Sequence, residues 1–264
     1  MFIYRNRAAV SPRTIVAALP HKPQVPSTLP YDPSRVKVIA CATVIEEMAP
    51  RMPPEMAREV LDFGLHFRPG GLTVALQEVI DRSTGFDTLL LGYGLCSRGV
   101  VGLRATTARL VIPRVDDCIA IFLGSRGDYT EQHAQEPGTY YLTKGWIEAK
   151  DSPLDGLHDL VPKYGEAKAE RIMRIMLKNY TRIAFIDTGA YELEHYRAYA
   201  QENARRFDLR YEEIAGKPGL VEKLLYGPWD GECVVVEPGG TVEYEAFVTD
   251  GHVPAAGLPG LNRA

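Results

Sequence analysis

The sequence lacks the features that would place the protein in a membrane, on a nucleic acid or outside the cell. No uninterrupted apolar stretch approaches the roughly 20 residues that a membrane-spanning helix needs, and the N-terminus lacks the apolar centre of a signal peptide. Long basic runs are absent, and the formal net charge of -4 provides no general attraction to phosphate or anionic lipid. We therefore expect a cytoplasmic protein that binds neither nucleic acid nor a membrane.

Cysteine is also scarce. Four cysteines in 264 residues are too few for a disulfide scaffold. In a reducing compartment we expect them to be free, metal-bound or reactive, so their positions become informative. The rest of the composition, with 45% hydrophobic and 24% charged residues, is that of an ordinary globular protein.

What the sequence does contain is an alternation of strand-like and helical patterns. Short apolar, β-branched runs predict strands at 35–40, 87–93, 109–113, 138–142, 182–186, 209–214 and 233–236. Helical periodicity predicts helices at 54–63, at 165–180 and at 192–206, and a further helix that ends at about Arg82. Alternating elements with nearly continuous apolar strands favour an α/β fold, in which helices cover both faces of a mainly parallel sheet.

The chain divides into an arm and a larger α/β region. Residues 1–34 are rich in proline and predict an extended arm. This arm could wrap a neighbouring subunit in a homo-oligomer, or it could be a loosely packed tail. Residues 35–264 form the α/β region, either as one domain or as two Rossmann-like lobes that meet in the loop-rich region near 145–155.

Cysteines and acids follow several of the predicted strands. In open parallel sheets, ligands bind in the crevice outside the carboxyl ends of the strands. The candidates at these ends are Cys41, Cys96, Asp116, Asp117, Cys118 and Asp187. Cys233 instead begins a strand, so we expect it at the opposite edge of the sheet, as a core residue.

Thiols from several strand ends would suit a metal such as Zn²⁺, which cysteine and histidine commonly hold in tetrahedral geometry. The predicted ligands are Cys96 and Cys118 with either His66 or Cys41, although no compact CxxC motif is present. A buried cysteine can also serve only as a small apolar residue, and this interpretation is favoured for Cys41. An iron–sulfur cluster on Cys41, Cys96 and Cys118 is an alternative.

Other residues near the strand ends complete the predicted site. Asp116 and Asp117 could hold a metal, orient a histidine or act as a catalytic base, or they could cap the following helix. The remaining predicted cofactor contacts are Gly94, Ser97 and Arg98 in a glycine-flanked turn, Tyr141 and Trp146 as walls for a flat ligand, and Asp187. Aromatic residues in such a cluster can equally close a core.

Several segments together resemble a known family. They are Gly94-Leu95-Cys96, Asp116-Asp117-Cys118, Leu123-Gly124-Ser125, the run 138–146, Leu65-His66 and Asp187-Thr188-Gly189. This combination resembles the domain-of-unknown-function family numbered 1638, of bacteria and archaea, over about residues 36–242. Members of that family often occur beside corrinoid proteins and methyltransferases of one-carbon metabolism. The resemblance implies a role in corrinoid-dependent methyl transfer, with a corrinoid protein or methyltransferase as partner.

The implied setting is compatible with the predicted metal site. Enzymes that move methyl groups to thiols commonly use zinc to lower the pKa of the thiol and present a thiolate. We therefore expect a zinc–thiolate site that activates a small thiol or binds a methyl carrier. The alternative is a non-catalytic accessory protein that binds a corrinoid protein, or inserts its cofactor, through the same crevice.

Overall fold

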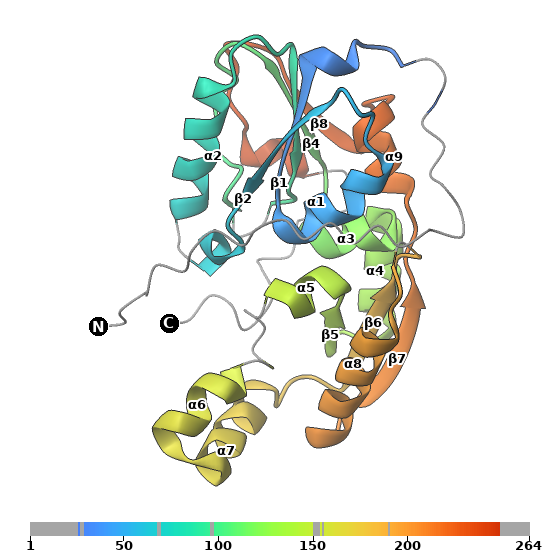
Figure 1. The fold of residues 1–264 in the computed structure, drawn as a ribbon. Helices are drawn as coiled ribbons and strands as arrows, with labels where there is room; N and C mark the ends of the chain where they lie inside the picture. Colours follow the sequence, from blue (N-terminus) through green and yellow to red (C-terminus); the bar gives the residue numbers. More distant parts are fainter. Residues whose placement is uncertain are drawn as a thin grey trace.

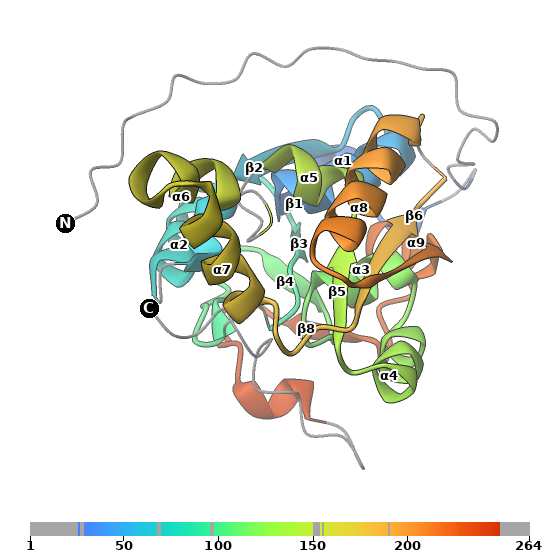
Figure 2. The ribbon, with the colours of Figure 1, turned by 90° about the horizontal axis from the view of Figure 1, so that it is seen from below.

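The computed structural model describes residues 26, 29–67, 70–95, 98–149, 154, 156–189 and 191–248. Two sheets organise this part of the chain (Figures 1 and 2). The first sheet has the strand order β2-β1-β3-β4-β8, and its strands are β1 (Val36–Cys41), β2 (Ala57–Leu61), β3 (Thr88–Gly92), β4 (Arg109–Pro113) and β8 (Cys233–Val236). The second has the order β5-β6-β7 and contains β5 (Thr139–Leu142), β6 (Arg182–Asp187) and β7 (Arg210–Ala215).

Helices connect the strands and cover the sheets. They are α1 (Ala42–Met48), α2 (Gly71–Arg82), α3 (Cys118–Leu123), α4 (Arg126–Gln135), α5 (Lys144–Ala149), α6 (Gly156–Tyr164), α7 (Glu166–Met176), α8 (Glu194–Arg206) and α9 (Gly219–Tyr226). Short 3₁₀ turns add η1 (Pro33–Arg35), η2 (Ala49–Arg51), η3 (Phe63–Phe67) and η5 (Tyr244–Phe247). In Figure 1, α2 covers one face of the first sheet, while α1 and α9 lie on the other. The predicted α/β fold is confirmed.

Parallel pairing dominates both sheets. The pairs β1–β2, β1–β3, β3–β4, β5–β6 and β6–β7 are all parallel, whereas β8 runs antiparallel to β4. Strands β1, β3 and β4 are almost wholly buried, which explains their continuous apolar sequences. The carboxyl ends of the parallel strands therefore meet at one edge of each sheet.

One predicted helix is a strand. The segment 54–63 was expected to be helical, but residues 57–61 form β2, whose side chains alternate between partly buried and exposed. This strand lies at the edge of the sheet, where Ala57 pairs with Lys37 and Leu61 pairs with Cys41. Its short polar sequence also fits a helical period, so pairing with β1 decides the outcome rather than local preference.

The chain changes sheets twice. It leaves the first sheet after β4 and enters the second at β5, then returns through α9 to β8 after β7. The loop-rich region near 145–155 thus follows the first strand of the second sheet, and residues 150–153 and 155 lie outside the described part of the chain.

The two sheets share one core. Tyr141, Ala184 and Ile186, on one face of the second sheet, pack into the apolar cluster that surrounds β1, β3 and β4. The opposite face of the second sheet contributes Leu142 and Phe185 to a separate cluster that also contains residues of α7 and α8. In Figure 2, α8 lies across this sheet. The carboxyl ends of both sheets consequently border the region where the two parts of the fold meet.

Cys233 lies at a different edge from the one predicted. Because β8 is antiparallel, its first residue pairs with Pro113, the last residue of β4. Cys233 therefore sits at the carboxyl edge of β4, and the expectation that it belongs at the opposite edge was wrong. Its predicted place in the core is correct, since only 3% of its surface is exposed.

Most of the predicted N-terminal arm, residues 1–25 and 27–28, lies outside the described residues. The end of the arm contacts the body of the protein, because the ring of Tyr31 stacks on Trp229 with ring centroids 5.5 Å apart and its hydroxyl donates to the carbonyl of Leu225. Within the described ranges, none of the helices has both the length and the apolar character required to cross a lipid bilayer.

Candidate functional site

Several predicted site residues lie along the carboxyl edge of the first sheet. Cys41 ends β1, and the turn η3 after β2 carries His66. Beyond the end of β3, the backbone N–H of Leu95 donates to the carbonyl of Val115, at 2.9 Å, so the segments that follow β3 and β4 remain paired. Cys118 begins α3 directly after this paired stretch.

Cys41 is a reduced thiol in a dry environment. Only 1% of its surface is exposed, and it occupies the position before the first residue of α1. Burial raises the pKa of this thiol, while the backbone N–H groups of Val44 and Thr43 partly oppose the shift by favouring the thiolate. Without a bound cation, Cys41 therefore stays protonated at neutral pH.

His66 is held as a neutral imidazole. Its ring stacks against Tyr93 and packs on Phe63, with ring centroids 5.8 and 5.1 Å away, and this burial lowers its pKa. Nδ1 lies 2.9 Å from the carbonyl oxygen of Phe63. Because a carbonyl can only accept, Nδ1 carries the proton and Nε2 keeps the lone pair that a metal could use.

The described residues supply only part of the predicted metal site. Cys118 is buried at the same sheet edge as Cys41. Across the described ranges, no three side chains of His, Cys, Asp or Glu are grouped so that they could hold one metal ion. Cys96 and Ser97, which belong to the predicted site, lie outside those ranges, and Leu95 is the last described residue before them.

The two acids before Cys118 have different surroundings. Asp117 caps α3, because its Oδ1 accepts from the backbone N–H of Ile119 at 2.8 Å. Burial raises the pKa of its carboxyl to about 6. Asp116 has its Oδ1 3.9 Å from a guanidinium nitrogen of Arg126. Capping, one of the roles expected for these acids, is confirmed for Asp117.

Aromatic residues from the other part of the fold face this edge. The ring of Trp146, in α5, meets Phe63 edge-on with the centroids 5.1 Å apart. The backbone of α5 also approaches α1 closely, since a Cβ on Gly145 would lie 3.0 Å from the Cα of Thr43. The buried Trp146 Nε1 and Tyr141 Oη have no hydrogen-bond partner among the described residues. Buried polar atoms usually have a partner, so a water or ligand would find donors here.

Three other predicted contacts are distributed differently. Gly94 lies within the paired stretch, where a Cβ would meet the carbonyl oxygen of Val115 at 2.8 Å. The guanidinium of Arg98 lies over the ring of Tyr244, 5.1 Å from its centroid. Asp187 ends β6 in the second sheet and forms an ion pair with Arg197 at 2.7 Å. Gly94 therefore lies with the thiols, whereas the charged groups of Arg98 and Asp187 have partners of their own.

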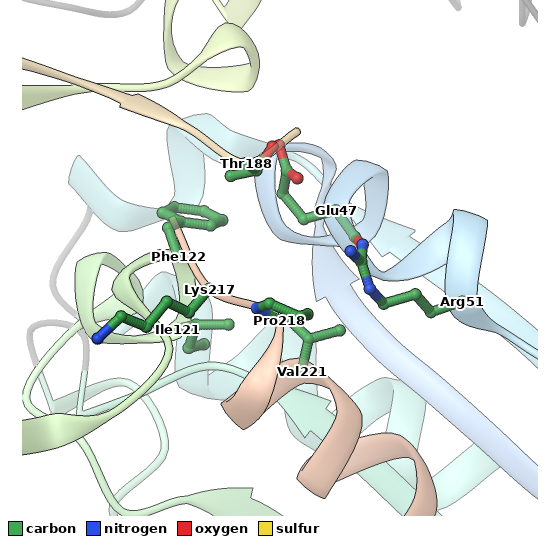
Figure 3. A pocket seen from close by; sticks show the side chains of 8 residues that line it. All are labelled: Glu47, Arg51, Ile121, Phe122, Thr188, Lys217, Pro218 and Val221. Atoms are coloured by element: carbon green, nitrogen blue, oxygen red, sulfur yellow. The ribbon is translucent and has the colours of Figure 1, made fainter. Parts of the chain in front are cut away.

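A small pocket beside α1 contains residues that the sequence reasoning missed (Figure 3). It is lined by Glu47, Arg51, Ile121, Phe122, Thr188, Lys217, Pro218 and Val221, with a cavity of about 10 Å³, the space of roughly one water molecule. The Glu47 carboxyl and the Thr188 side chain point toward one another. Burial raises the pKa of Glu47 to about 7. Nothing in its sequence context, two adjacent acids in a short helix, distinguishes it from a surface glutamate.

The comparisons with known proteins point to one family. A model of the family DUF1638, described as a protein of unknown function, matches residues 60–225. No curated protein and no solved structure matches the chain. The matched range includes His66, Cys118, Tyr141 and Trp146.

Proposed function

We propose a function for this chain from the premise that it belongs to the DUF1638 family. The proposal is that Cys96 and Cys118, together with either His66 or Cys41, bind zinc at the carboxyl edge of the first sheet. The site would serve methyl transfer in one-carbon metabolism. It would either activate a small thiol or bind a methyl carrier, with a corrinoid protein as the partner. Bound zinc would lower the pKa of a coordinated thiol and so present a thiolate at neutral pH.

The observation that carries the proposal is the common location of the donor atoms. Cys41, His66 and Cys118 come from segments far apart in the chain, yet all three follow the ends of parallel strands of the same sheet. Two thiols and one neutral imidazole are a donor set suited to zinc. The described residues alone form no group of three ligands, so at most two of these three side chains would share an ion with Cys96.

The surrounding residues would have distinct tasks. The carbonyl of Phe63 fixes the His66 tautomer and leaves Nε2 for the metal. Asp117 caps α3 and thereby positions Cys118. Trp146 and Tyr141 close the other side, where their polar atoms could bind the polar end of a small ligand. The apolar walls would exclude water from a thiolate.

Elemental analysis tests the metal site directly. Protein purified anaerobically without chelators should contain zinc in a fixed ratio to the chain, and Cys96→Ser and Cys118→Ser should lose it. Cys233→Ser is the matched control, because Cys233 is also a buried reduced thiol but lies in β8. Metal-free protein, or equal zinc in wild type and both serine variants, would contradict the proposal. Iron with acid-labile sulfide would instead support the iron–sulfur alternative.

A second assay separates catalysis from an accessory role. Incubation of the zinc-loaded protein with a methylated corrinoid protein and a small thiol should give methylated thiol, and Cys118→Ser should reduce the rate at least tenfold. Formation of a stable complex without turnover would favour an accessory protein instead.

A further inference from the structure

The last turn of α1 is a contact between the two parts of the fold. The carboxylate of Glu46 accepts from Lys144, which begins α5, at 2.7 Å, and its backbone carbonyl accepts from the hydroxyl of Tyr191 at 2.6 Å. Lys144 and Tyr191 also contact each other, with the ammonium 4.5 Å from the ring centroid. Residues near the carboxyl edge of the second sheet thus hold this turn of α1.

Glu47 is the buried member of the same turn. Only 4% of its surface is exposed, and its Oε2 has no hydrogen-bond partner among the described residues. The Thr188 side chain, which follows β6, faces its carboxyl across the pocket (Figure 3). A buried carboxylate with an unpaired oxygen costs several kcal/mol in general, whereas a neutral carboxyl costs far less.

We propose that the protonation state of Glu47 controls whether the last turn of α1 stays packed against Thr188, which follows β6; this packed arrangement is the closed form. The neutral carboxyl keeps the last turn of α1 against Thr188. The carboxylate draws water into the pocket between them and loosens this contact. This device depends on contacts away from the thiols and acts whether or not they bind a metal.

The charged groups around Glu47 do not neutralise it. Arg51 also lines the pocket, but its Nε lies 3.6 Å from a carboxylate oxygen of Glu222. One of its terminal nitrogens contacts the backbone carbonyl of Glu47. Lys144 is shared between Glu46 and Glu148. The neighbouring carboxylate of Glu46 repels a charge on Glu47.

The other polar groups lining the site contribute little compensation. Lys217 lies on the pocket wall, yet its ammonium forms an ion pair with Asp128. The hydroxyl of Tyr191 is occupied by the Glu46 carbonyl, so Thr188 provides the main hydrogen bond that favours the Glu47 carboxylate. Burial outweighs this bond together with the attraction of Arg51 and Lys144, and the pKa of Glu47 rises from 4.5 to about 7.

The direction of the pH effect follows from this shift. A carboxyl whose pKa is higher in the closed form than in the open form favours closure when it is protonated. Closure is therefore strongest below the ordinary pKa of 4.5, weakens as the pH rises toward about 7, and loses this contribution above that value. The contact should therefore loosen between about pH 4.5 and about pH 7.

Hydrogen exchange measured by mass spectrometry, corrected for intrinsic rates, tests the proposal between about pH 5.5 and about pH 8.5. Peptides containing α1 and the end of β6 should lose protection several-fold as the pH rises, with the midpoint of the loss below about pH 7, whereas Glu47→Gln should stay protected throughout. The control Glu46→Gln should lower protection at every pH but still show the pH-dependent loss of protection. Unchanged wild-type protection across the range, or a midpoint retained in Glu47→Gln, would overturn the proposal.

A second variant keeps the test decisive if Glu47→Gln does not fold. Thr188→Val removes the hydroxyl that favours the Glu47 carboxylate, so it should move the midpoint to higher pH. A midpoint that does not move would overturn the proposal. Because neither readout depends on zinc, the outcome is independent of the elemental analysis of the thiol variants.

Discussion

The two sheets solve the problem of burying polar groups in different ways. At the carboxyl edge of the first sheet, Cys41 and His66 are buried among apolar side chains, and their pKa values shift toward the neutral forms. At the carboxyl edge of the second sheet, charges are instead paired, as in the contacts of Arg197 with Asp187 and Glu213. The difference concerns the two carboxyl edges, because the first sheet also contains a charge pair where Lys37 of β1 meets Glu59 of β2.

The largest effect is expected from a substitution that breaks the charge network of the second sheet. Arg182 is 2% exposed and donates to Thr139 at 2.9 Å and to Glu212 at 2.8 Å. Arg182→Met should cost about 3 kcal/mol of unfolding free energy, because it removes every hydrogen bond of a buried guanidinium and takes the donor away from the buried Thr139 hydroxyl. Denaturant titration measures this loss.

The control for this prediction is Arg210→Met. Arg210 contacts the same Glu212 but is exposed, so its replacement should have a much smaller effect. Equal losses of unfolding free energy in the two variants would show that the burial of Arg182 does not increase its contribution to stability.

A smaller effect is expected from crowding the edge of the first sheet. In Gly94→Ala, the new Cβ would lie 2.8 Å from the Val115 carbonyl oxygen and 2.9 Å from the Asp117 backbone nitrogen. Backbone must shift to relieve these contacts, at a cost of about 2 kcal/mol, and Cys118 should move with it. The free energy of unfolding, measured by denaturant titration, and the zinc content should therefore both fall.

Gly231→Ala is the matched control, since no heavy atom lies within 4 Å of the Cβ it would add. The account of the first-sheet edge would be weakened if Gly94→Ala retained both wild-type stability and wild-type zinc content.

The smallest effect concerns the contact between the sheets. Lys144→Met removes ion pairs to Glu46 and Glu148, which should cost about 1 kcal/mol at low salt. Because salt screens partly exposed charges, the difference from wild type should shrink in about 1 M salt. Urea titrations at the two salt concentrations measure this, and a salt-independent loss would mean that packing of the Lys144 stem dominates.

The sequence predicts the central strands well because their environment is uniform. Strands β1, β3, β4 and β6 are buried on both faces and therefore read as continuous apolar runs. Strand β2 was predicted as a helix because it lies at an edge, where Arg58 and Val60 face solvent and only pairing with β1 determines its structure. Edge strands lack the local signal that central strands carry.

The same limit applies to the candidate site. The positions of Cys41 and Cys118 follow from strand ends alone, and the structure places both at one sheet edge. Cys233 was assigned to the wrong edge because the direction of β8 depends on a distant pairing with β4. Glu47 was missed because its burial arises only when residues of the second sheet close over α1. Tertiary contacts, rather than sequence patterns, create these two environments.

The most direct test of the central claim is whether the separated thiols bind one metal ion together. Cobalt(II) substituted into the anaerobic protein should give a strong thiolate-to-cobalt charge-transfer absorption band, which weakens in Cys96→Ser and in Cys118→Ser but not in Cys233→Ser. A cobalt spectrum without that band, or one unchanged by the first two substitutions, would show that these thiols do not form a shared metal site.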